Sequence, residues 1–403
     1  MRILLVNQYY PPDTSATAWL AQTVAGTLAR RHHVTVLAGR PSYDPTEYHP
    51  FYWSRMEGNG PVRVCRVGST DFPRHRMTRR LSNYLTYLML SLPDALSIPA
   101  DLVVAMTDPP FAGLLGAWIA RQRGVPFVYN IRDLYPDMAL GGAIVENRPW
   151  VQAWERMHRR ALRQAARVIV LGEDMRERIA AKGVDPSRIV VVRDGAVLDR
   201  PHSGDNGSRS GHPAITAIRD GFEFVALHAG NLGFAGAWPT LVDAARQLEN
   251  EGTGIVFVGQ GAWRDRVAGM AAGSRAVRLL PFRPPEEIPY VIAAADVHIV
   301  TVRRGLEGVV VPSKLYGILA AGKPVLAVAP RSSDVVRIVA DAGCGLAADP
   351  DDPASVVAAL RTLRANPALL REMGRRAREK ALEFERGRQL ELLLDVVEEA
   401  GGC

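Results

Sequence analysis

Residues 307–323 carry the side chains best suited to chemistry, in a loop that leads into a short predicted helix. Ser313 is a residue type that begins helices and Gly322 one that ends them, so we expect a helix between them, followed by a strand. Lys314 in the first turn adds positive charge to the positive end of the helix dipole, which is unfavourable. The placement makes sense if an anion such as a phosphate binds there, held by backbone N–H groups and the ammonium group.

Gly317 is the second unusual residue of this segment. A glycine inside a helix costs about 1 kcal/mol relative to alanine. We therefore interpret it as a point where a ligand or another backbone comes close. The alternative interpretation of the segment is an exposed lysine and a packing glycine.

Two other loops also follow predicted strands. Residues 230–236, Gly-Asn-Leu-Gly-Phe-Ala-Gly, precede a helix, and a strand, a glycine loop and a helix form the arrangement that cradles phosphates. A plain turn explains the same residues. Residues 280–284 could offer Phe282 or Arg283 to a nucleotide base.

Residues 130–137, Asn-Ile-Arg-Asp-Leu-Tyr-Pro-Asp, place two carboxylates and an arginine after a strand. Asp133 or Asp137, beside Arg132, could orient or deprotonate a hydroxyl group. An aspartate before such a turn is also a common helix cap, and that alternative stays open.

The elements that must position these groups form two series of strands and helices, the pattern of parallel α/β sheets. We expect two Rossmann-like domains facing each other across a cleft, with ligands at the carboxyl ends of the strands. Residues 1–197 form the first domain, residues 198–221 a polar linker, and residues 222–403 the second, with the last helices able to pack back on the first. The predicted strands are residues 2–7, 34–38, 62–67, 102–105, 126–130 and 168–171, then 224–229, 254–258, 277–280, 297–301 and 324–329; residues 18–31, 111–123 and most of 354–400 are predicted helical.

Composition narrows the class of protein. The 403 residues carry a formal net charge of +7, which favours an anionic partner, but no motif of a nucleic-acid-binding fold is present. Cys65, Cys344 and Cys403 lack the spacing of a zinc site, so no metal is expected and a reducing cytoplasm fits best. No signal peptide or transmembrane segment is predicted. The aspartates of residues 349–353 precede a helix, and we interpret them as caps.

A basic cluster precedes an apolar stretch at residues 81–92 that includes Tyr84 and Tyr87. This arrangement is typical of an element that meets the surface of a membrane, here the inner face of the cell membrane. An amphipathic helix packed on the domain, with solvated charges, is equally expected. The cluster consists of Arg74, His75, Arg76, Arg79 and Arg80.

Taken in order, several motifs resemble the retaining family 4 glycosyltransferases of the GT-B fold, in the branch associated with bacterial surface polysaccharides and related glycosides. They are residues 3–12 with Tyr-Tyr-Pro-Pro, 229–233, 258–261, 295–297 and 312–324. The resemblance covers essentially the whole chain. It implies a nucleotide-sugar donor, with a UDP-sugar favoured, bound by the second domain, and a hydroxyl acceptor, which a lipid could carry, bound by the first. It also implies transfer of a hexosyl or N-acetylhexosaminyl group with retention of configuration and no obligatory metal.

The residue patterns and the resemblance together assign residues to three sets. Donor binding falls to Asn231, Gly233, Gly259, Phe282, Glu307, Pro312, Ser313, Lys314, Leu315 and Gly317. The catalytic candidates are Lys314, Asp133, Asp137 and Arg132. The opening loop, with Tyr10, Thr14, Ser15 and Thr17, lies where relatives contact the acceptor and the donor phosphate.

The chain departs from the family pattern at two places. Many relatives carry a pair of glutamates, the second of which binds the donor ribose, and the matching positions here are Val309 and Gly317. Glu307 lies nearby and could serve instead. The loop of residues 231–236 also lacks the lysine that many relatives have, so Lys314, with Arg303 or Arg304, would carry more of the diphosphate charge.

Two other functions fit parts of this pattern. A nucleotide-sugar epimerase also uses two α/β domains and a nucleotide site, but needs no acceptor. A non-catalytic nucleotide-sugar-binding protein would explain the missing glutamates.

Overall fold

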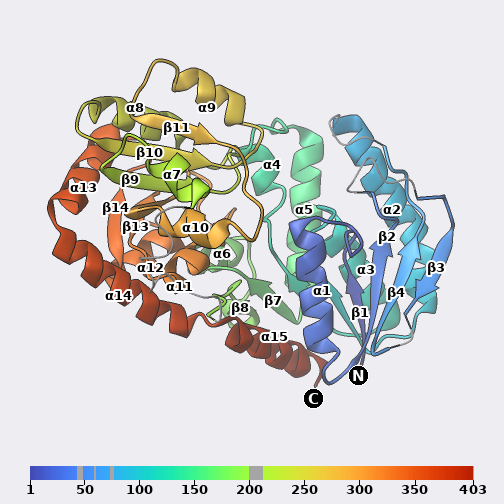
Figure 1. Ribbon diagram of the computed structural model, residues 1–403. Coiled ribbons are helices and arrows are strands. Elements are labelled where there is room, and N and C mark those ends of the chain that lie inside the picture. Colours follow the sequence, from blue (N-terminus) through green and yellow to red (C-terminus); the bar gives the residue numbers. More distant parts are fainter. Residues whose placement is uncertain (43–48, 59, 73–76, 199–211, 403) are drawn as a thin grey trace. The chain divides into compact units, whose positions relative to one another are not determined.

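The computed structural model describes all residues except 43–48, 59, 73–76, 199–211 and 403. It divides into two compact units, one formed by residues 1–192 and 390–403 and the other by residues 193–389. Each unit is an α/β body with its own sheet and covering helices (Figure 1). The predicted class of two Rossmann-like units is confirmed.

The sheet of the first unit has eight described strands in the order β3-β4-β2-β1-β5-β6-β7-β8. All neighbours are parallel except β3, which runs antiparallel to β4 at one edge. The strands are β1 (Arg2–Val6), β2 (His33–Gly39), β3 (Ser54–Glu57), β4 (Val62–Val67), β5 (Leu102–Ala105), β6 (Phe127–Asn130), β7 (Arg167–Val170) and β8 (Ile189–Val191). The helices are α1 (Ala16–Leu28), α2 (Met77–Ser97), α3 (Ala112–Arg123), α4 (Asp137–Gly141), α5 (Pro149–Gln164) and α6 (Glu173–Ala181), with the 3-10 helix Pro186–Arg188.

The last helix, α15 (Arg386–Gly401), ends in the first unit. Its Leu394 and Val397 are buried in one cluster with Ile3 and Leu5 of β1. On the surface, Arg31 of the loop after α1 pairs with Glu398 at 3.1 Å. The apolar face of the first sheet is therefore completed by the end of the chain.

The second unit has a parallel sheet of six described strands in the order β11-β10-β9-β12-β13-β14. The strands are β9 (Phe224–Ala229), β10 (Thr253–Val258), β11 (Val277–Leu280), β12 (Val297–Thr301), β13 (Val325–Val328) and β14 (Gly345–Ala348). The helices are α7 (Pro213–Arg219), α8 (Trp238–Gln247), α9 (Arg264–Met270), α10 (Ile288–Ala293), α11 (Lys314–Ala320), α12 (Asp334–Ala342), α13 (Pro353–Ala365) and α14 (Pro367–Glu383).

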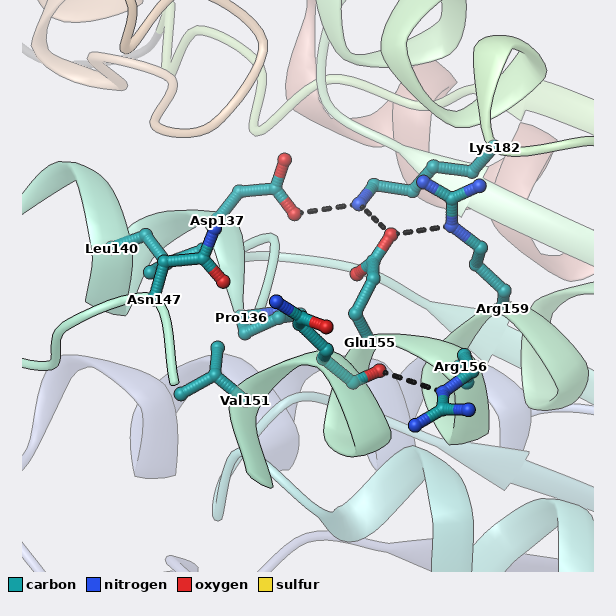
Figure 2. A pocket seen from close by; sticks show the side chains of 10 residues that line it. Pro136, Asp137, Leu140, Asn147, Val151, Glu155, Arg156, Arg159 and Lys182 are labelled. Carbon is teal, nitrogen blue, oxygen red and sulfur yellow. Dashed lines mark hydrogen bonds and ion pairs between the residues drawn. The ribbon is translucent and has the colours of Figure 1, made fainter. Parts of the chain in front are cut away.

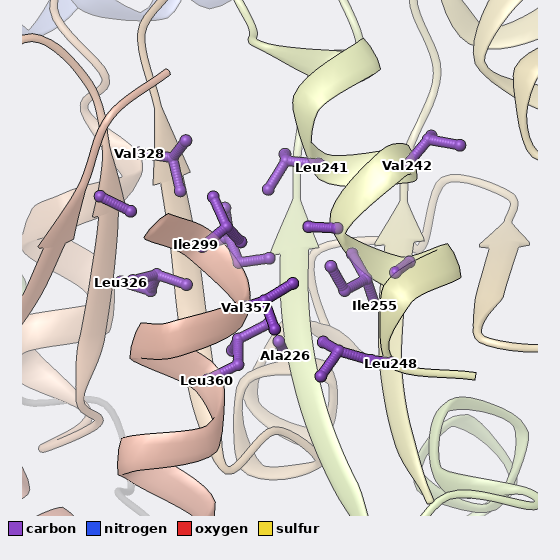
Figure 3. Packing of buried hydrophobic residues seen from close by; sticks show 14 of the residues in the cluster. Ala226, Leu241, Val242, Leu248, Ile255, Ile299, Leu326, Val328, Val357 and Leu360 are labelled. Atoms are coloured by element: carbon purple, nitrogen blue, oxygen red, sulfur yellow. The ribbon is translucent and has the colours of Figure 1, made fainter. Parts of the chain in front are cut away.

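The main core of the second unit lies where α8 and α13 pack on one face of this sheet (Figure 3). Leu241 of α8 and Leu360 of α13 meet Ala226 and Ile299 of the central strands, and all four are fully buried or nearly so. Strands buried on both faces are the reason these segments are continuous apolar runs in the sequence. The core holds the ends of β9 and β12 rigidly beneath the loops that follow them.

Every predicted strand exists, within one or two residues of its predicted bounds, but β3, β8 and β14 were not predicted. β3 and β14 are edge strands, and β8 is only three residues long. The predicted helix at 18–31 begins earlier, because Ser15 caps α1 by accepting a hydrogen bond from Ala18 N at 3.1 Å. Most of the predicted linker, residues 199–211, lies outside the described residues, and residues 213–219 of that range are the helix α7.

Candidate functional site

Lys314 begins α11, and its side chain reaches the end of β9 in the same unit. The ammonium nitrogen Nζ lies 2.9 Å from Nε2 of His228. His228 is buried, with the rings of Trp238 and Phe257 beside it. Burial lowers the pKa of Lys314 to about 7, so the protonated and neutral forms of this side chain are both populated at neutral pH.

Gly230 makes room for this lysine. A Cβ atom at Gly230 would lie 3.0 Å from Lys314 Nζ, and its φ of +137° is a conformation that side chains rarely adopt. A Cβ at Gly259, whose φ is +152°, would overlap the carbonyl oxygen of Gly230. The predicted glycine loop thus packs against the loop after β10, and glycine is needed for that contact as well as for any ligand.

Ser313 does not act as the capping residue that the sequence predicts. Its backbone already has helical angles, with φ −57° and ψ −20°, and its side chain makes no capping hydrogen bond. Ser313 therefore has the predicted position directly before α11 but makes no capping hydrogen bond, and its exposed hydroxyl remains available beside Pro312 and the buried Leu315. Gly322, with φ +65°, does end the helix as expected.

Gly317 faces open space. No described atom lies within 4 Å of the position that a Cβ atom would take, so packing against another backbone does not explain this glycine. Val309, at the other position where relatives carry a glutamate, is fully buried. Glu307 is held in its own turn, where Oε2 accepts a hydrogen bond from Gly305 N at 2.7 Å.

The remaining predicted donor residues differ in how they are held. Asn231 and Gly233 lie in the loop beside Gly230, and the Gly233 carbonyl accepts a hydrogen bond from the Trp238 indole at 2.6 Å. Phe282 is 58% exposed after β11, where an aromatic face is accessible. Arg304 is engaged by Asp349 at 2.7 Å and Asp351 at 2.5 Å, which makes it a weaker candidate for a diphosphate.

The structure confirms the structural interpretation of residues 349–353. Asp352 caps α13 by accepting a hydrogen bond from Ala354 N at 2.9 Å, and Pro353 occupies the first turn. Within the described part of the chain, no three His, Cys, Asp or Glu side chains gather as a metal site would require.

In the first unit, Asp133 follows β6 and lies near Asp108, which follows β5. Burial raises the pKa of Asp133 to about 6, Asp108 adds to the rise by repulsion, and Arg132 opposes it. The hydroxyl oxygen Oγ1 of Thr107 lies 3.4 Å from the backbone N of both Arg132 and Asp133. Sequence reasoning missed Thr107 and Asp108, although their place after a strand beside β6 was a usable signal.

Asp137 has different surroundings from Asp133. Burial alone would raise its pKa, but Lys182 at 2.7 Å and Arg178 at 3.1 Å lower it. Lys182 also pairs with Glu155 at 2.7 Å. A carboxylate held this firmly by two cations is a poor base, so the geometry favours Asp133 for the predicted role.

A pocket of about 630 Å³ adjoins this ion-pair network (Figure 2). Pro136, Leu140 and Val151 supply apolar wall, while Gln152 and Arg156 add polar groups. Asp137, Glu155, Arg159 and Lys182 are joined by hydrogen bonds or ion pairs at its edge. A concave wall with both apolar and hydrogen-bonding groups, next to the Asp133 loop, suits a carbohydrate.

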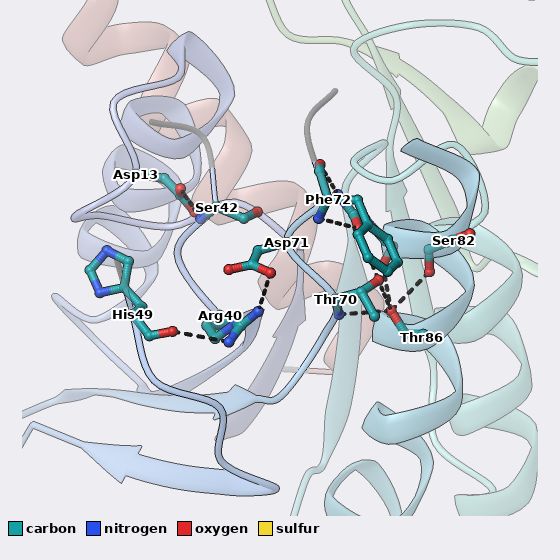
Figure 4. A network of polar contacts seen from close by, with 10 residues as sticks. Asp13, Arg40, Ser42, His49, Thr70, Asp71, Phe72, Ser82 and Thr86 are labelled. Atoms are coloured by element: carbon teal, nitrogen blue, oxygen red, sulfur yellow. Dashed lines mark hydrogen bonds and ion pairs between the residues drawn. The ribbon is translucent and has the colours of Figure 1, made fainter. Parts of the chain in front are cut away.

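The opening loop is partly structural. Ser15 caps α1 and lies 3.2 Å from the hydroxyl of Thr17, while Tyr10 is buried and Thr14 is exposed. Asp13 accepts a hydrogen bond from Ser42 N at 2.9 Å, and nearby Arg40 pairs with Asp71 at 2.7 Å (Figure 4). These hydrogen bonds hold the loop at the carboxyl end of the first sheet.

Two fully buried side-chain amides lie at the carboxyl ends of strands in the first sheet, and neither is hydrogen-bonded to a residue that the structure describes. Neither the oxygen nor the nitrogen of the Gln8 or Asn130 side-chain amide has a hydrogen-bond partner among the described residues. Gln8 follows β1 and Asn130 ends β6, on either side of β5. Unsatisfied buried amides are costly, which is expected near a site that takes polar ligands or water.

The two parallel α/β units have the GT-B fold. Residues 16–195 match the family described as "Glycosyl transferase 4-like domain", and residues 218–380 match "Glycosyl transferases group 1". The chain is therefore a glycosyltransferase built from a family 4-like domain and a group 1 domain.

Similar proteins agree with this class. "Probable glycosyltransferase WbjE" of Pseudomonas aeruginosa is 27% identical over 371 residues, which cover 88% of this chain and 87% of that protein. Anabaena Alr3699/HepE, in a structure with UDP and glucose, has a TM-score of 0.70 at 17% identity, with 99% and 100% of the two chains covered. WaaG, a glycosyltransferase involved in lipopolysaccharide biosynthesis, has a TM-score of 0.67 at 18% identity, with 98% and 99% covered.

Proposed function

We propose that this protein transfers a hexosyl or N-acetylhexosaminyl group from a UDP-sugar to a hydroxyl acceptor with retention of configuration. The observation that carries the proposal is the Lys314 ammonium held between α11 and Gly230, at the carboxyl end of β9. This end of a parallel sheet is where nucleotides bind in α/β folds. The UDP bound in the structure of HepE supports the choice of nucleotide.

The proposed chemistry breaks the bond between the anomeric carbon and the diphosphate, and the acceptor oxygen bonds to that carbon. The nucleoside diphosphate leaves with the electron pair, and its developing charge is stabilised by protonated Lys314 and nearby backbone N–H groups. Leu315, Pro312, Ser313 and the open face at Gly317 would shape the site around the nucleotide. Its other contacts would come from Asn231, Gly233, Gly259, Phe282 and Glu307.

We assign the acceptor to the first unit, where Asp133 orients or deprotonates the hydroxyl and Arg132 supports its charge. The pocket beside Asp137 would hold part of the acceptor, together with Tyr10, Thr14, Ser15 and Thr17 of the opening loop. We further propose a glycan acceptor in polysaccharide, glycolipid or related glycoside assembly, in the cytoplasm at the inner face of the membrane, with no obligatory cofactor. WaaG, which is involved in lipopolysaccharide biosynthesis, supports the proposal of a glycan acceptor.

A panel of UDP- and GDP-sugars, assayed for nucleoside diphosphate release with and without glycan acceptors, tests the proposal. We expect release that depends on both substrates, and NMR of the product should show the donor's anomeric configuration. Lys314→Met should abolish turnover and weaken donor binding, and intact turnover would refute the assignment. Isomerised donor without acceptor would indicate the epimerase, while donor binding without any turnover would indicate the binding protein.

A further inference from the structure

Helix α2 packs on the first sheet with a polar and aromatic face turned inward. Asn83 accepts hydrogen bonds from Phe72 N at 3.0 Å and from the Thr70 hydroxyl at 2.9 Å. The Tyr87 hydroxyl, fully buried, donates to Leu37 O of β2 at 2.7 Å. The inward face thus has its hydrogen bonds satisfied without contributing a run of leucines to the core.

The leucines face outward. Leu81, Leu85, Met89, Leu92 and Leu96 are all exposed, Met89 by 69%, and their spacing of four, four, three and four residues forms one stripe along the helix. We call these five residues the α2 stripe. No charged residue occurs from Leu81 to Pro93. A helix on a water-facing surface normally carries charged residues on this side, so the polarity of α2 is reversed.

The sheet edge extends the apolar surface. Met56 of the edge strand β3 is exposed and lies opposite Cys65 of β4. Residues opposite each other in paired strands share a face of the sheet. Helix α2 packs against β4, and Asp94 of α2 is near enough to raise the pKa of the buried Cys65 thiol, so this shared face is the one that α2 covers. Met56 therefore lies on the same side of the unit as the α2 stripe.

The rim of this surface is basic. Arg63, two residues before Cys65 on β4, is exposed on the same face and its charge acts on Cys65. Arg123 at the end of α3 donates to the carbonyl of Ala95 at 2.9 Å, near the far end of the stripe, and Arg79 lies at its start. Asp94 is the single acidic residue between Arg79 and Ser97. Three cations therefore border an apolar stripe with one half-buried anion.

We propose that the α2 stripe docks in the surface of an anionic lipid bilayer, with α2 lying in the plane of the interface. Apolar side chains rimmed by arginines match the acyl region and the anionic headgroups at once. A second copy of the chain fits less well, because a two-fold contact through this face would bring like-charged rims together. None of the described helices is long and apolar enough to cross a membrane, so α2 would lie on the bilayer.

This inference deepens the proposed function, because it names the surface through which the enzyme would contact the membrane. It rests on the proposed function only for the purpose of that contact. The sequence predicts the contact at residues 74–92, but Arg74, His75 and Arg76 fall outside the described residues. The surface defined here instead centres on the outward leucines and continues to Leu96.

The test is sedimentation of the full chain with vesicles of phosphatidylcholine containing about one third phosphatidylglycerol, without donor or acceptor. We expect binding that weakens with salt and with pure phosphatidylcholine. Leu85→Glu combined with Met89→Glu should lower the partition coefficient at least about tenfold, because two apolar contacts are lost and two like charges are added. Leu382→Glu on α14, which is 51% exposed and lies in the second unit, is the matched control and should bind as the unaltered chain does.

Equal binding of the double variant, or no binding by the unaltered chain, would overturn the inference. So would a dimer, seen by light scattering without lipid, that the double variant abolishes, because that result assigns the stripe to a second copy. Met89→Glu alone, at the most exposed position, retains the test if the double variant fails to fold. Vesicle binding needs no turnover, so its failure leaves glycosyl transfer standing, and failure of transfer leaves the docking measurable.

Discussion

Lys314 Nζ lies 2.9 Å from His228 Nε2, and burial lowers the pKa of this lysine. The pKa of His228 is lowered well below its ordinary value, first by burial and then by Lys314, so the histidine is neutral. Lys314 is half-buried beside a neutral histidine, so its protonated form is suited to pair with an anionic ligand.

Donor affinity should therefore depend on pH. A diphosphate binds the protonated lysine, whose pKa in the free protein is about 7, so the dissociation constant for UDP should rise as pH increases from 6 to 9. Well above pH 7 the rise approaches about tenfold per pH unit, until the pKa of the complex is reached. Calorimetry in buffers of different ionisation enthalpy should show proton uptake on binding.

Lys314→Arg is the control for this pH dependence, because an arginine stays charged across the range. Its UDP affinity should be lower than that of the unaltered protein at pH 6, since the site is shaped for a lysine, but nearly independent of pH. A flat profile in the unaltered protein would contradict the assigned role of Lys314.

Two glycines of the second unit should respond oppositely to alanine. Gly317→Ala fills open space inside α11 and should raise the free energy of unfolding by up to about 1 kcal/mol, while weakening UDP binding if the nucleotide lies over that position. Gly259→Ala would overlap the Gly230 carbonyl at a positive φ and should lower the free energy of unfolding by several kcal/mol, on the order of the larger backbone effects. Urea denaturation and UDP titration of both variants separate stability from binding, and unchanged UDP affinity in Gly317→Ala would place the nucleotide elsewhere.

Asp133 and Asp137 should separate catalysis from stability. Asp133→Asn should lower kcat by about 10²-fold or more, the usual contribution of a general base. In the unaltered enzyme kcat/KM should fall as pH drops below about 6, where Asp133 of the free enzyme becomes protonated. Asp137→Asn should mainly lower the melting temperature, because it leaves Lys182 and Arg178 with fewer partners. The reverse pattern would transfer the catalytic role to Asp137.

His158 should destabilise the first unit in acid. Its pKa is lowered from 6.5 to about 4, chiefly by burial against Tyr129 and then by Lys182. The folded state therefore binds fewer protons than the unfolded state, and the stability present above pH 6.5 is lost as pH falls towards 4. From pH 7.5 to 4.5 this amounts to about 2.5 kcal/mol. Urea denaturation of His158→Gln should show a smaller loss over that interval, and an equal loss would mean that other groups dominate.

The periodicity of the sequence determined most of the fold, because strands buried on both faces leave continuous apolar runs. β9, β11 and β12 have the predicted bounds. An exposed edge strand lacks such an apolar run, so the periodicity does not predict it. β3, Ser-Arg-Met-Glu, has no buried residue, and its pairing with β4 depends on contacts that a local pattern does not contain.

The site was only partly predictable. Lys314 stood out because its charge opposes the helix dipole, yet its partner His228 is 86 residues away and lies in an ordinary buried strand. Asp133 and Asp137 were indistinguishable in sequence. Burial and the charge of Asp108 raise the pKa of Asp133, whereas Lys182 lowers that of Asp137, and these surroundings come from other elements. Local motifs indicated the chemistry, and tertiary neighbours decided which residue carries it.

The return of residues 390–403 to the first unit also orders events during synthesis on the ribosome. The first sheet emerges early, but the apolar residues that Leu394 and Val397 cover stay open until α15 has left the ribosome. The second unit, complete at residue 389, can close before the first has its final helix. Until α15 emerges, a nascent chain of this protein therefore carries an uncovered hydrophobic face, and α15 is the element that ends its exposure to aggregation and chaperones.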